Sequence, residues 1–374
     1  MAENIIVGGG VYGTAVAWEL ATRGAEVLLL EAKHVASGAS GGPGRRGVRA
    51  NYRDHRELPL MVRSRALWPS LHERLNVSPL FEQTGHLMLL ESVTDLAAAD
   101  ARVSMQHLCD VPTQRLSREA LLDLEPDIAP AIQGAVHCPG DGVADHGATT
   151  RAYAAAAKAA GAMIRESVSA TRLVTRDDRV VAVETGTGDT IPVDGNLLLL
   201  ANSGVRKLVQ PWLDLPTWNL PFQALLSAPL ANNPVHHLIG HASRTLSLKR
   251  EQDGRLMISG GRTGRWDAAT QTGTTVTENV AANVADAVAV YPSLADLKVE
   301  TADAGHLEAD SIDGIPVIDR LPGLANVILA TGWSGHGWAI APATAQLIAA
   351  WALDGDKPTL LAPFAFSRFA QVRT

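Results

Sequence analysis

The chain has little cysteine, no long hydrophobic run and no excess of positive charge. Among 374 residues only Cys109 and Cys138 are cysteines, which excludes a disulfide scaffold and a multi-cysteine metal site and fits a reducing compartment. With 32 Lys and Arg against 39 Asp and Glu, the formal charge of −7 argues against a general nucleic-acid binder. No continuous apolar stretch, including residues 197–201, approaches the roughly 18 residues that a membrane span needs.

These absences define the expected setting of the protein. Strand-like sequence begins at Asn4, so no secretory signal fits in front of it. The twelve histidines show no HExxH or other metal-ligand spacing. We therefore expect a cytoplasmic protein with no integral membrane segment, no metal and no nucleic-acid partner. Its length suggests two or three domains.

Glycine, in contrast, is abundant and unevenly placed. There are 33 glycines, and ten of them fall between Gly8 and Gly47. The first group follows a short apolar run, residues 4–7, and reads GGGVYG. A helix pattern over residues 14–23 comes next, then an apolar strand pattern over residues 26–30 that ends in Glu31. This order of strand, GxGxxG, helix, strand and acid is typical of a dinucleotide-binding unit.

Each residue of this unit has a physical task. Gly8 permits the tight turn, Gly10 lets the backbone approach a pyrophosphate, and Gly13 lets the helix and strand pack closely. The N-terminus of the helix offers free N–H groups to the phosphates. Glu31 can accept hydrogen bonds from a ribose hydroxyl. This unit alone leaves both FAD and NAD(P) open as the ligand.

The second glycine group, within residues 36–52, is too rich in small residues for a core helix. It suits backbone that lies flat against a large planar ligand. Five arginines follow closely, and we interpret most of them as a solvated helix face; the full set is Arg45, Arg46, Arg49, Arg53 and Arg56. Arg46 and Arg49 directly follow the glycine loop, so they are the better candidates for facing a ligand, since arginine binds a carboxylate through two parallel hydrogen bonds.

A third glycine-rich turn joins a strand to a helix near the C-terminus. The strand pattern covers residues 326–331, the turn reads GWSGHGW, and an apolar helix runs from residue 341 to residue 353. The N-terminus of this helix would stabilise a ring that becomes anionic on reduction. His336 in the turn either donates a hydrogen bond to such a ring or caps the helix.

Together these segments resemble the D-amino-acid oxidase superfamily of FAD enzymes, and within it the sarcosine oxidase and glycine oxidase branch. The matching residues are Val7 to Gly13, Glu31, Ser37-Gly38-Ala39-Ser40 and Ser334-Gly335-His336-Gly337, with weaker matches at Gly142-Val143-Ala144-Asp145 and Asp313-Gly314-Ile315-Pro316-Val317-Ile318. The resemblance extends over nearly the whole chain in the same order. It implies an α/β fold, in which a discontinuous Rossmann-type FAD-binding domain carries an α+β substrate domain with an antiparallel sheet.

The resemblance also implies boundaries and site residues. The FAD-binding domain would comprise residues 1–78, 141–210 and 305–374, and the substrate domain residues 79–140 and 211–304, with strands over 86–90, 224–227 and 255–259. Val168, in the strand-like stretch 166–173, would give backbone contacts to the adenine. The cofactor-binding residues would be Gly8, Gly10, Val11, Tyr12, Gly13, Glu31, Ala32, Ser37, Ser40, Gly41, Val168, Gly204, Gly332, Ser334, Gly335, His336 and Gly337.

The implied activity is oxidation of the C–N bond of a small amino acid or N-alkyl amino acid. A hydride passes to flavin N5, and the imine is then hydrolysed, with oxygen or another acceptor reoxidising the flavin. Arg46 would lie near the flavin, Arg49 would hold the substrate carboxylate, Tyr52 would form a pocket wall, and His336 would complete the catalytic set. The alternatives are an FAD-dependent 2-hydroxy acid dehydrogenase and an FAD-binding subunit of a larger oxidoreductase complex. The chain would act as a homo-oligomer or in a hetero-complex.

Three departures from the family pattern change the expected site. The family's second carboxylate partner, a lysine after the GHG turn, falls on Ala339. The lysine that helps oxygen react in monomeric sarcosine oxidase aligns with Met257, which favours another acceptor. The covalent flavin cysteine is missing, so we expect noncovalent FAD, with His306 near that position. Lys249 is interpreted as a solvated hairpin lysine, in preference to a pocket residue.

Overall fold

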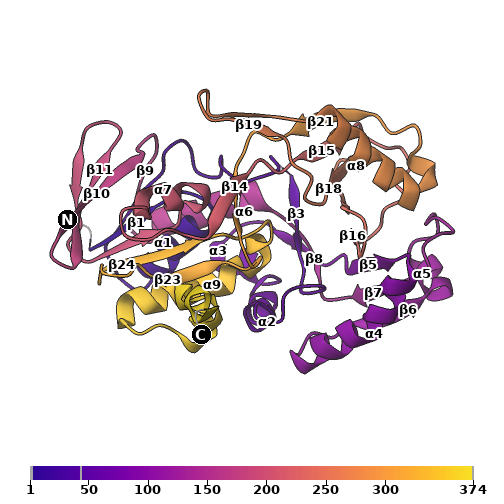
Figure 1. The fold of residues 1–374 in the computed structure, drawn as a ribbon, viewed down its shortest axis with the longest axis horizontal. Coiled ribbons are helices and arrows are strands. Elements are labelled where there is room, and N and C mark those ends of the chain that lie inside the picture. Colours follow the sequence, from indigo (N-terminus) through magenta and orange to yellow (C-terminus); the bar gives the residue numbers. More distant parts are fainter. Residues whose placement is uncertain (1–2, 43, 373–374) are drawn as a thin grey trace.

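A six-stranded sheet forms the centre of one half of the molecule (Figure 1). The computed structural model describes residues 3–42 and 44–372. The strand order is β23-β24-β13-β1-β2-β9, and every neighbouring pair is parallel except β23 with β24. The bounds are β1 Asn4–Val7, β2 Val27–Leu30, β9 Met163–Arg165, β13 Asn196–Leu199, β23 Val317–Arg320 and β24 Val327–Thr331. These strands are short apolar runs because both faces of the sheet are covered.

Alternate residues of this sheet enter two different cores. Ile6, Leu198 and Ile328 pack with helices on one face. Those helices are α1 Val11–Ala21, α2 Leu58–Leu67, α6 His146–Ala159 and α9 Gly337–Asp354, with the short α3 Leu71–Leu75 beside them. Ile5 and Leu197 pack on the opposite face, against α7 Val205–Val209 and an antiparallel sheet of β10 Ala170–Arg176, β11 Arg179–Thr185 and β12 Thr190–Pro192. The sheet is therefore a layer between helices and a smaller sheet.

An eight-stranded sheet forms the other half of the molecule, on the right in Figure 1. Its order is β21-β15-β18-β17-β16-β5-β7-β6. The bounds are β5 His86–Leu90, β6 Gln114–Ser117, β7 Gly134–Cys138, β15 Ala224–Ser227, β16 Leu238–His241, β17 Ser247–Arg250, β18 Leu256–Ser259 and β21 Val299–Asp303. The expected antiparallel sheet is confirmed with one exception, the pair in which β16 runs parallel to β5. These two strands come from distant segments, so no hairpin dictates their relative direction.

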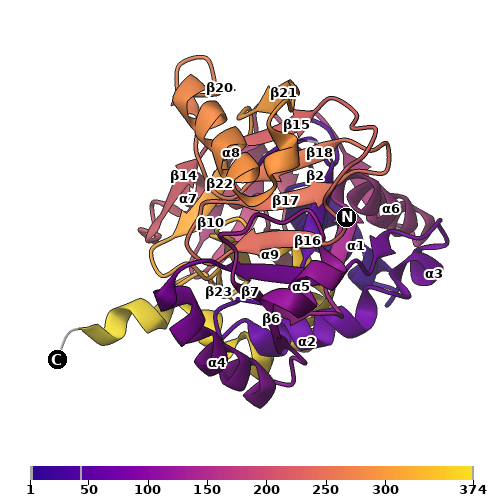
Figure 2. The ribbon, with the colours of Figure 1, turned by 90° about the vertical axis from the view of Figure 1, so that its right-hand side faces the viewer.

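Helices lie at both ends of this sheet (Figure 2). One face packs against α5 Arg118–Leu124 and α8 Thr277–Val290, and Leu248 and Ile258 contribute to that core. The opposite face meets α4 Val93–Leu108 through Met88 and Ala99. Two short 3-10 helices cover Asn202–Gly204 and Pro292–Leu294, and two more cover Thr359–Phe364 and Phe366–Val372. No helix among the described residues is long and apolar enough to cross a membrane.

Three small sheets complete the fold, and two of them join the expected domains. One contains β3 Arg45–Val48, β8 Gly142–Asp145 and β4 Phe81–Glu82. The second pairs β14 Thr217–Leu220 with β22 Glu308–Ser311, and the third pairs β19 Arg265–Asp267 with β20 Thr272–Thr274. Strands β4 and β14, expected in the substrate domain, thus pair with strands of the FAD-binding segments.

Two local expectations are wrong. The arginine-rich stretch is not a solvated helix face, because Arg45 and Arg46 lie in strand β3, and Arg45 and Arg53 are buried beside Glu82 and Glu57. Ion pairing and strand pairing with β8 outweigh the helix-like charge spacing here. The stretch 166–173 is not one strand either, because Ser167, with φ of 60°, turns the chain between β9 and β10.

Candidate active site

The first glycine turn is closed by direct backbone contact. The N–H of Gly8 donates to the Leu30 carbonyl at 2.8 Å. A Cβ on Gly13 would lie 1.8 Å from the Gly8 carbonyl oxygen, whereas one on Gly10 would meet open space. Helix α1 begins at Val11, and no side chain caps its N-terminus. The turn therefore leaves room and free N–H groups for a phosphate ligand.

Glu31 holds the loops beside this turn. Its Oε2 accepts from the N–H of Gly9 at 2.6 Å, and its Oε1 accepts from the N–H of Lys33 at 2.7 Å. Its carbonyl accepts from the N–H of the buried Val168 at 2.8 Å. Ala32 follows as an exposed residue. Glu31, Ala32 and Val168 are therefore neighbours.

Arg46 folds back over the second glycine group. Its Nη2 donates to the carbonyls of Ser40 at 3.4 Å and Gly41 at 2.8 Å. Its Nη1 lies 3.1 Å from the Sδ of Met257. Ser37 closes the start of this segment, since its Oγ accepts from the N–H of His34. Burial lowers the pKa of the Arg46 guanidinium to about 10, so it stays charged at neutral pH.

The C-terminal turn is tied to the N-terminal one by Tyr12. The Tyr12 ring stacks on Trp333, with centroids 3.7 Å apart and planes 8° apart, and its hydroxyl donates to the Gly337 carbonyl at 2.5 Å. The turn uses left-handed backbone at Gly332, Ser334 and Gly335, with φ of 75°, 51° and 79°. The Tyr12 side chain is thus committed to the protein, and only its backbone is open to a ligand.

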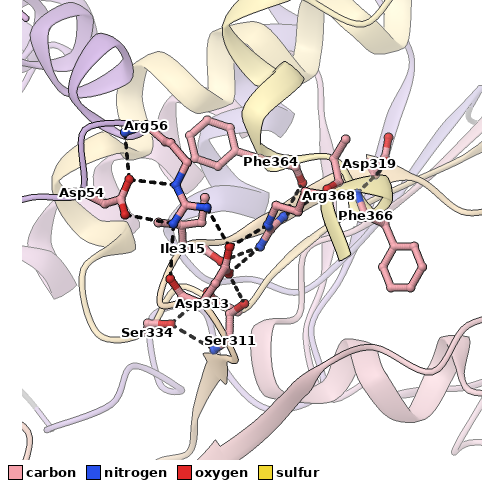
Figure 3. Close-up of polar contacts among 12 residues, drawn as sticks. Asp54, Arg56, Ser311, Asp313, Ile315, Asp319, Ser334, Phe364, Phe366 and Arg368 are labelled. Carbon is pink, nitrogen blue, oxygen red and sulfur yellow. Dashed lines mark hydrogen bonds and ion pairs between the residues drawn. The ribbon is translucent and has the colours of Figure 1, made fainter. Parts of the chain in front are cut away.

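Ser334 anchors the C-terminal turn to strand β22 (Figure 3). Its Oγ accepts from the N–H of Ser311 at 3.0 Å, and its N–H donates to the Ala309 carbonyl. Ser311 in turn donates to Asp313, which also forms ion pairs with Arg56 and Arg368 at 2.9 and 3.0 Å. This network attaches the C-terminal segment to the turn.

His336 precedes α9 and does not cap it with its side chain. Burial, with Arg53 and Arg49 nearby, lowers the pKa of His336 to about 3. Its Nδ1 lies 3.8 Å from the Glu57 Oε2, and its carbonyl accepts from Arg53 at 2.7 Å. The imidazole is therefore neutral near pH 7, with one ring N–H to donate. Two roles were expected for the His336 side chain, capping of the helix and donation to a ring. The structure shows no capping hydrogen bond from this side chain.

Glu308 is a site residue that sequence reasoning missed. It accepts hydrogen bonds from the Ser40 hydroxyl at 3.0 Å, the Asn202 amide at 3.2 Å and the Gly335 N–H at 3.1 Å. These donors come from all three segments around the expected flavin, and Gly204 ends the 3-10 helix that carries Asn202. Burial raises the pKa of Glu308. No sequence motif marks this glutamate.

Arg49 and Tyr52, which follow β3, contact different partners. The Arg49 Nη1 donates to the Asn51 carbonyl at 2.6 Å, and burial lowers its pKa to about 10. The Tyr52 ring lies 4.9 Å from the Arg102 guanidinium of α4 and packs near Met88. Within the described ranges, the side chains of Arg49 and Tyr52 share no hydrogen bond or cation–π contact.

Lys249 is not the solvated hairpin residue that the sequence suggested. Its side chain on β17 is buried and donates to the hydroxyls of Ser247 and Ser259 at 3.2 and 2.9 Å. Burial, followed by the charge of Arg46, lowers its pKa to about 7. The local alternation of polar and apolar residues did not reveal which face of the sheet is covered. Among the described residues no cluster of three or more His, Cys, Asp or Glu side chains is arranged to hold a metal ion.

Comparisons with known proteins agree with this geometry. The family model described as FAD dependent oxidoreductase (DAO) matches residues 4–351. The sarcosine oxidase subunit beta of Arthrobacter sp is 26% identical, with 98% of this chain and 91% of the relative covered. The glycine oxidase of Geobacillus kaustophilus is 27% identical, with coverage of 97% and 96%.

Solved structures show the same architecture. L-proline dehydrogenase from P. horikoshii superposes with a TM-score of 0.90 at 25% identity, covering 99% of this chain and 98% of that one. Glycine oxidase from Geobacillus kaustophilus has the same fold, with a TM-score of 0.87 at 22% identity and 98% coverage of each chain. The predicted fold class and the resemblance to the sarcosine and glycine oxidase branch are confirmed. The chain belongs to the FAD-dependent oxidoreductase (DAO) family.

Proposed function

We propose that the chain binds one FAD noncovalently along its three glycine-rich turns. The uncapped N-termini of α1 and α9 support this, because they offer N–H groups where a pyrophosphate and a flavin ring would lie. His306, the residue nearest the family's covalent attachment point, lies 3.1 Å from Asp303 in an ion-pair geometry of its own.

We further propose the expected domain division and cofactor contacts. The division into residues 1–78, 141–210 and 305–374 against 79–140 and 211–304 is supported by the two large sheets, whose strands come from one set each. Gly8, Gly10 and Gly13 would face the pyrophosphate, Glu31 the ribose and Val168 the adenine. Denaturing the purified protein should release flavin into solution; a colourless protein that takes up no FAD would contradict the proposal.

The reaction we propose is oxidation of the C–N bond of a small amino acid or N-alkyl amino acid. The observation that carries it is the pair of half-buried guanidinium groups of Arg46 and Arg49, neither of which forms an ion pair within the described part of the chain. A buried cation without a partner is costly, and a substrate carboxylate would neutralise it. FAD supplies the two-electron acceptor when it is bound.

The protein's own residues orient the substrate and exclude water. Arg49 would hold the carboxylate, and Arg46, fixed by the carbonyls of the second glycine group, would lie beside the flavin. His336, neutral at pH 7, would donate its ring N–H without adding charge. The eight-stranded sheet would cover the site.

The electron acceptor and assembly are part of the same proposal. Met257, beside Arg46, occupies the position of the oxygen-activating lysine of the resemblance, which favours an acceptor other than oxygen. Two of the relatives are named sarcosine oxidase subunit beta, which favours an FAD-binding subunit within a hetero-complex as the second candidate. The two free cysteines favour the cytoplasm.

Anaerobic flavin bleaching tests the reaction. A panel of amino acids, N-methyl amino acids and 2-hydroxy acids should separate C–N from C–O oxidation, and reoxidation in air should separate oxidase from dehydrogenase. R49A should mainly raise the concentration at which carboxylate substrates bleach the flavin. If carboxylate substrates react with R49A as with the unaltered protein, Arg49 is not the anchor.

A further inference from the structure

The strand register places Lys249 on the face of the eight-stranded sheet that looks toward the second glycine group. In the β17–β18 pair, Leu248 lies opposite Ile258, and both belong to the core with α8. Lys249 lies opposite Met257 on the other face. The Met257 Sδ is the atom that Arg46 contacts at 3.1 Å, so Lys249 is one cross-strand neighbour away from Arg46.

The Lys249 ammonium has only neutral partners. It is 5% exposed, and its Nζ donates to the hydroxyls of Ser247 and Ser259. Within the described part of the chain, no carboxylate lies within ion-pair distance of it. The charge of Glu251 raises the pKa of Lys249, but the Glu251 carboxylate accepts a hydrogen bond from the N–H of Arg45 at 2.9 Å. The amine is therefore buried without the counter-ion that a buried charge requires.

Neighbouring charged groups also shift the pKa values of Lys249 and of His86. Arg46 and Arg49 both lower the pKa of Lys249, and Lys249 and Arg49 both lower the pKa of His86 on β5. The buried His86 is held neutral, so the charges that act on Lys249 are those of the two arginines and of Glu251. Three cations from β3, the segment after it and β17 thus share one region, and none of them forms an ion pair within residues 3–42 and 44–372.

We propose that Lys249 is the second cation of the carboxylate-binding site, acting together with Arg49. This rests on the proposed oxidation of amino acids. The lysine that the resemblance places after the GHG turn is replaced by the fully buried Ala339, so α9 provides no charge there. Strand β17 of the eight-stranded sheet would provide the second positive charge instead, through Lys249. A single carboxylate bound between Lys249 and Arg49 would neutralise part of the cluster, and the substrate class is therefore restricted to carboxylic acids.

Binding of an unreactive carboxylate to the FAD-loaded protein tests this without turnover. The probe is propionate, its uncharged isostere propionamide is the ligand control, and the readout is the change in the visible flavin spectrum on titration. K249M, which keeps an unbranched side chain without the charge, should raise the Kd of propionate at least tenfold and leave propionamide unaffected. K207M, at an exposed lysine on α7, is the matched control and should bind propionate as the unaltered protein does.

The pH dependence gives a second, variant-independent measurement. Because Lys249 must be protonated to bind an anion and its pKa is lowered to about 7, the Kd of propionate should rise above pH 7 and approach tenfold per pH unit. R49A should keep the pH dependence but move its onset to higher pH, because the charge of Arg49 contributes to lowering the pKa of Lys249. K249M should abolish the pH dependence. If K249M does not retain FAD, the change of the propionate Kd with pH in the unaltered protein is the remaining test of the proposal.

Two outcomes overturn the proposal: K249M binds propionate as tightly as the unaltered protein, or the pH slope is absent. Failure of the proposed reaction can be distinguished from failure of the Lys249 proposal. If Lys249 is required for propionate binding but no amino acid bleaches the flavin, the anion site stands and the C–N oxidation does not. If amino acids bleach K249M at unchanged concentrations, the reaction stands and the role of Lys249 does not.

Discussion

The burial of Lys249 predicts an unusual pH dependence of stability in the FAD-free protein. An exposed lysine in the unfolded chain has its ordinary pKa of 10.5, whereas burial in the fold lowers the pKa to about 7. That gap corresponds to a cost of about 5 kcal/mol for holding the charged amine in the fold, at about 1.4 kcal/mol per pKa unit. The cost is fully present below pH 7, where both states carry the proton.

The direction in which the free energy of unfolding changes with pH follows from the number of protons that each state binds. Between pH 7 and 10.5 the folded protein has lost the proton and the unfolded chain still binds it, so the free energy of unfolding rises with pH. The unaltered protein should therefore gain about 2 to 3 kcal/mol relative to K249M between pH 7.5 and 9.5. At pH 6, K249M should be the more stable of the two, because Met carries no charge into the buried position.

Urea denaturation of both proteins, with FAD removed, at pH 6, 7.5 and 9.5 measures this difference. K207M is the control, and its stability should change with pH in parallel with the unaltered protein, because Lys207 is exposed. Parallel curves for K249M and the unaltered protein would refute the reasoning. They would mean that the lysine is solvated or paired with an acid.

Three further predictions concern other parts of the fold. Gly13→Ala should abolish FAD binding, measured as bound flavin per chain, because its Cβ would lie 1.8 Å from the Gly8 carbonyl oxygen and force α1 away from the turn. A thiol reagent should label Cys109 and spare Cys138 in the native protein, since burial raises the pKa of the Cys138 thiol; labelling of both before unfolding would contradict this. Tyr12→Phe should keep the ring stacking but lose about 1 to 2 kcal/mol in thermal unfolding, because a buried carbonyl of the C-terminal turn loses its donor.

Features encoded over short distances were readable from the residues alone. Strand β1 was predicted at the observed residues, and β24 and α9 within a few residues of their bounds. The glycine turn before α1 was recognised because a tight strand-to-helix turn demands glycine at fixed spacing. The fold class, the family and the cofactor followed from the family resemblance that these local patterns carry. The helix expected over 14–23 begins earlier, at Val11, directly after the turn.

Only the tertiary structure decided which distant residues meet. The position of Glu308 among Ser40, Asn202 and Gly335 depends on four separate segments and has no local pattern. The face occupied by Lys249 depends on the pairing of β17 with β18, since a shift of one residue would turn its side chain to the opposite face. Hydrophobic periodicity predicts that a strand is covered, but the identity of the covering segment is a property of the whole chain.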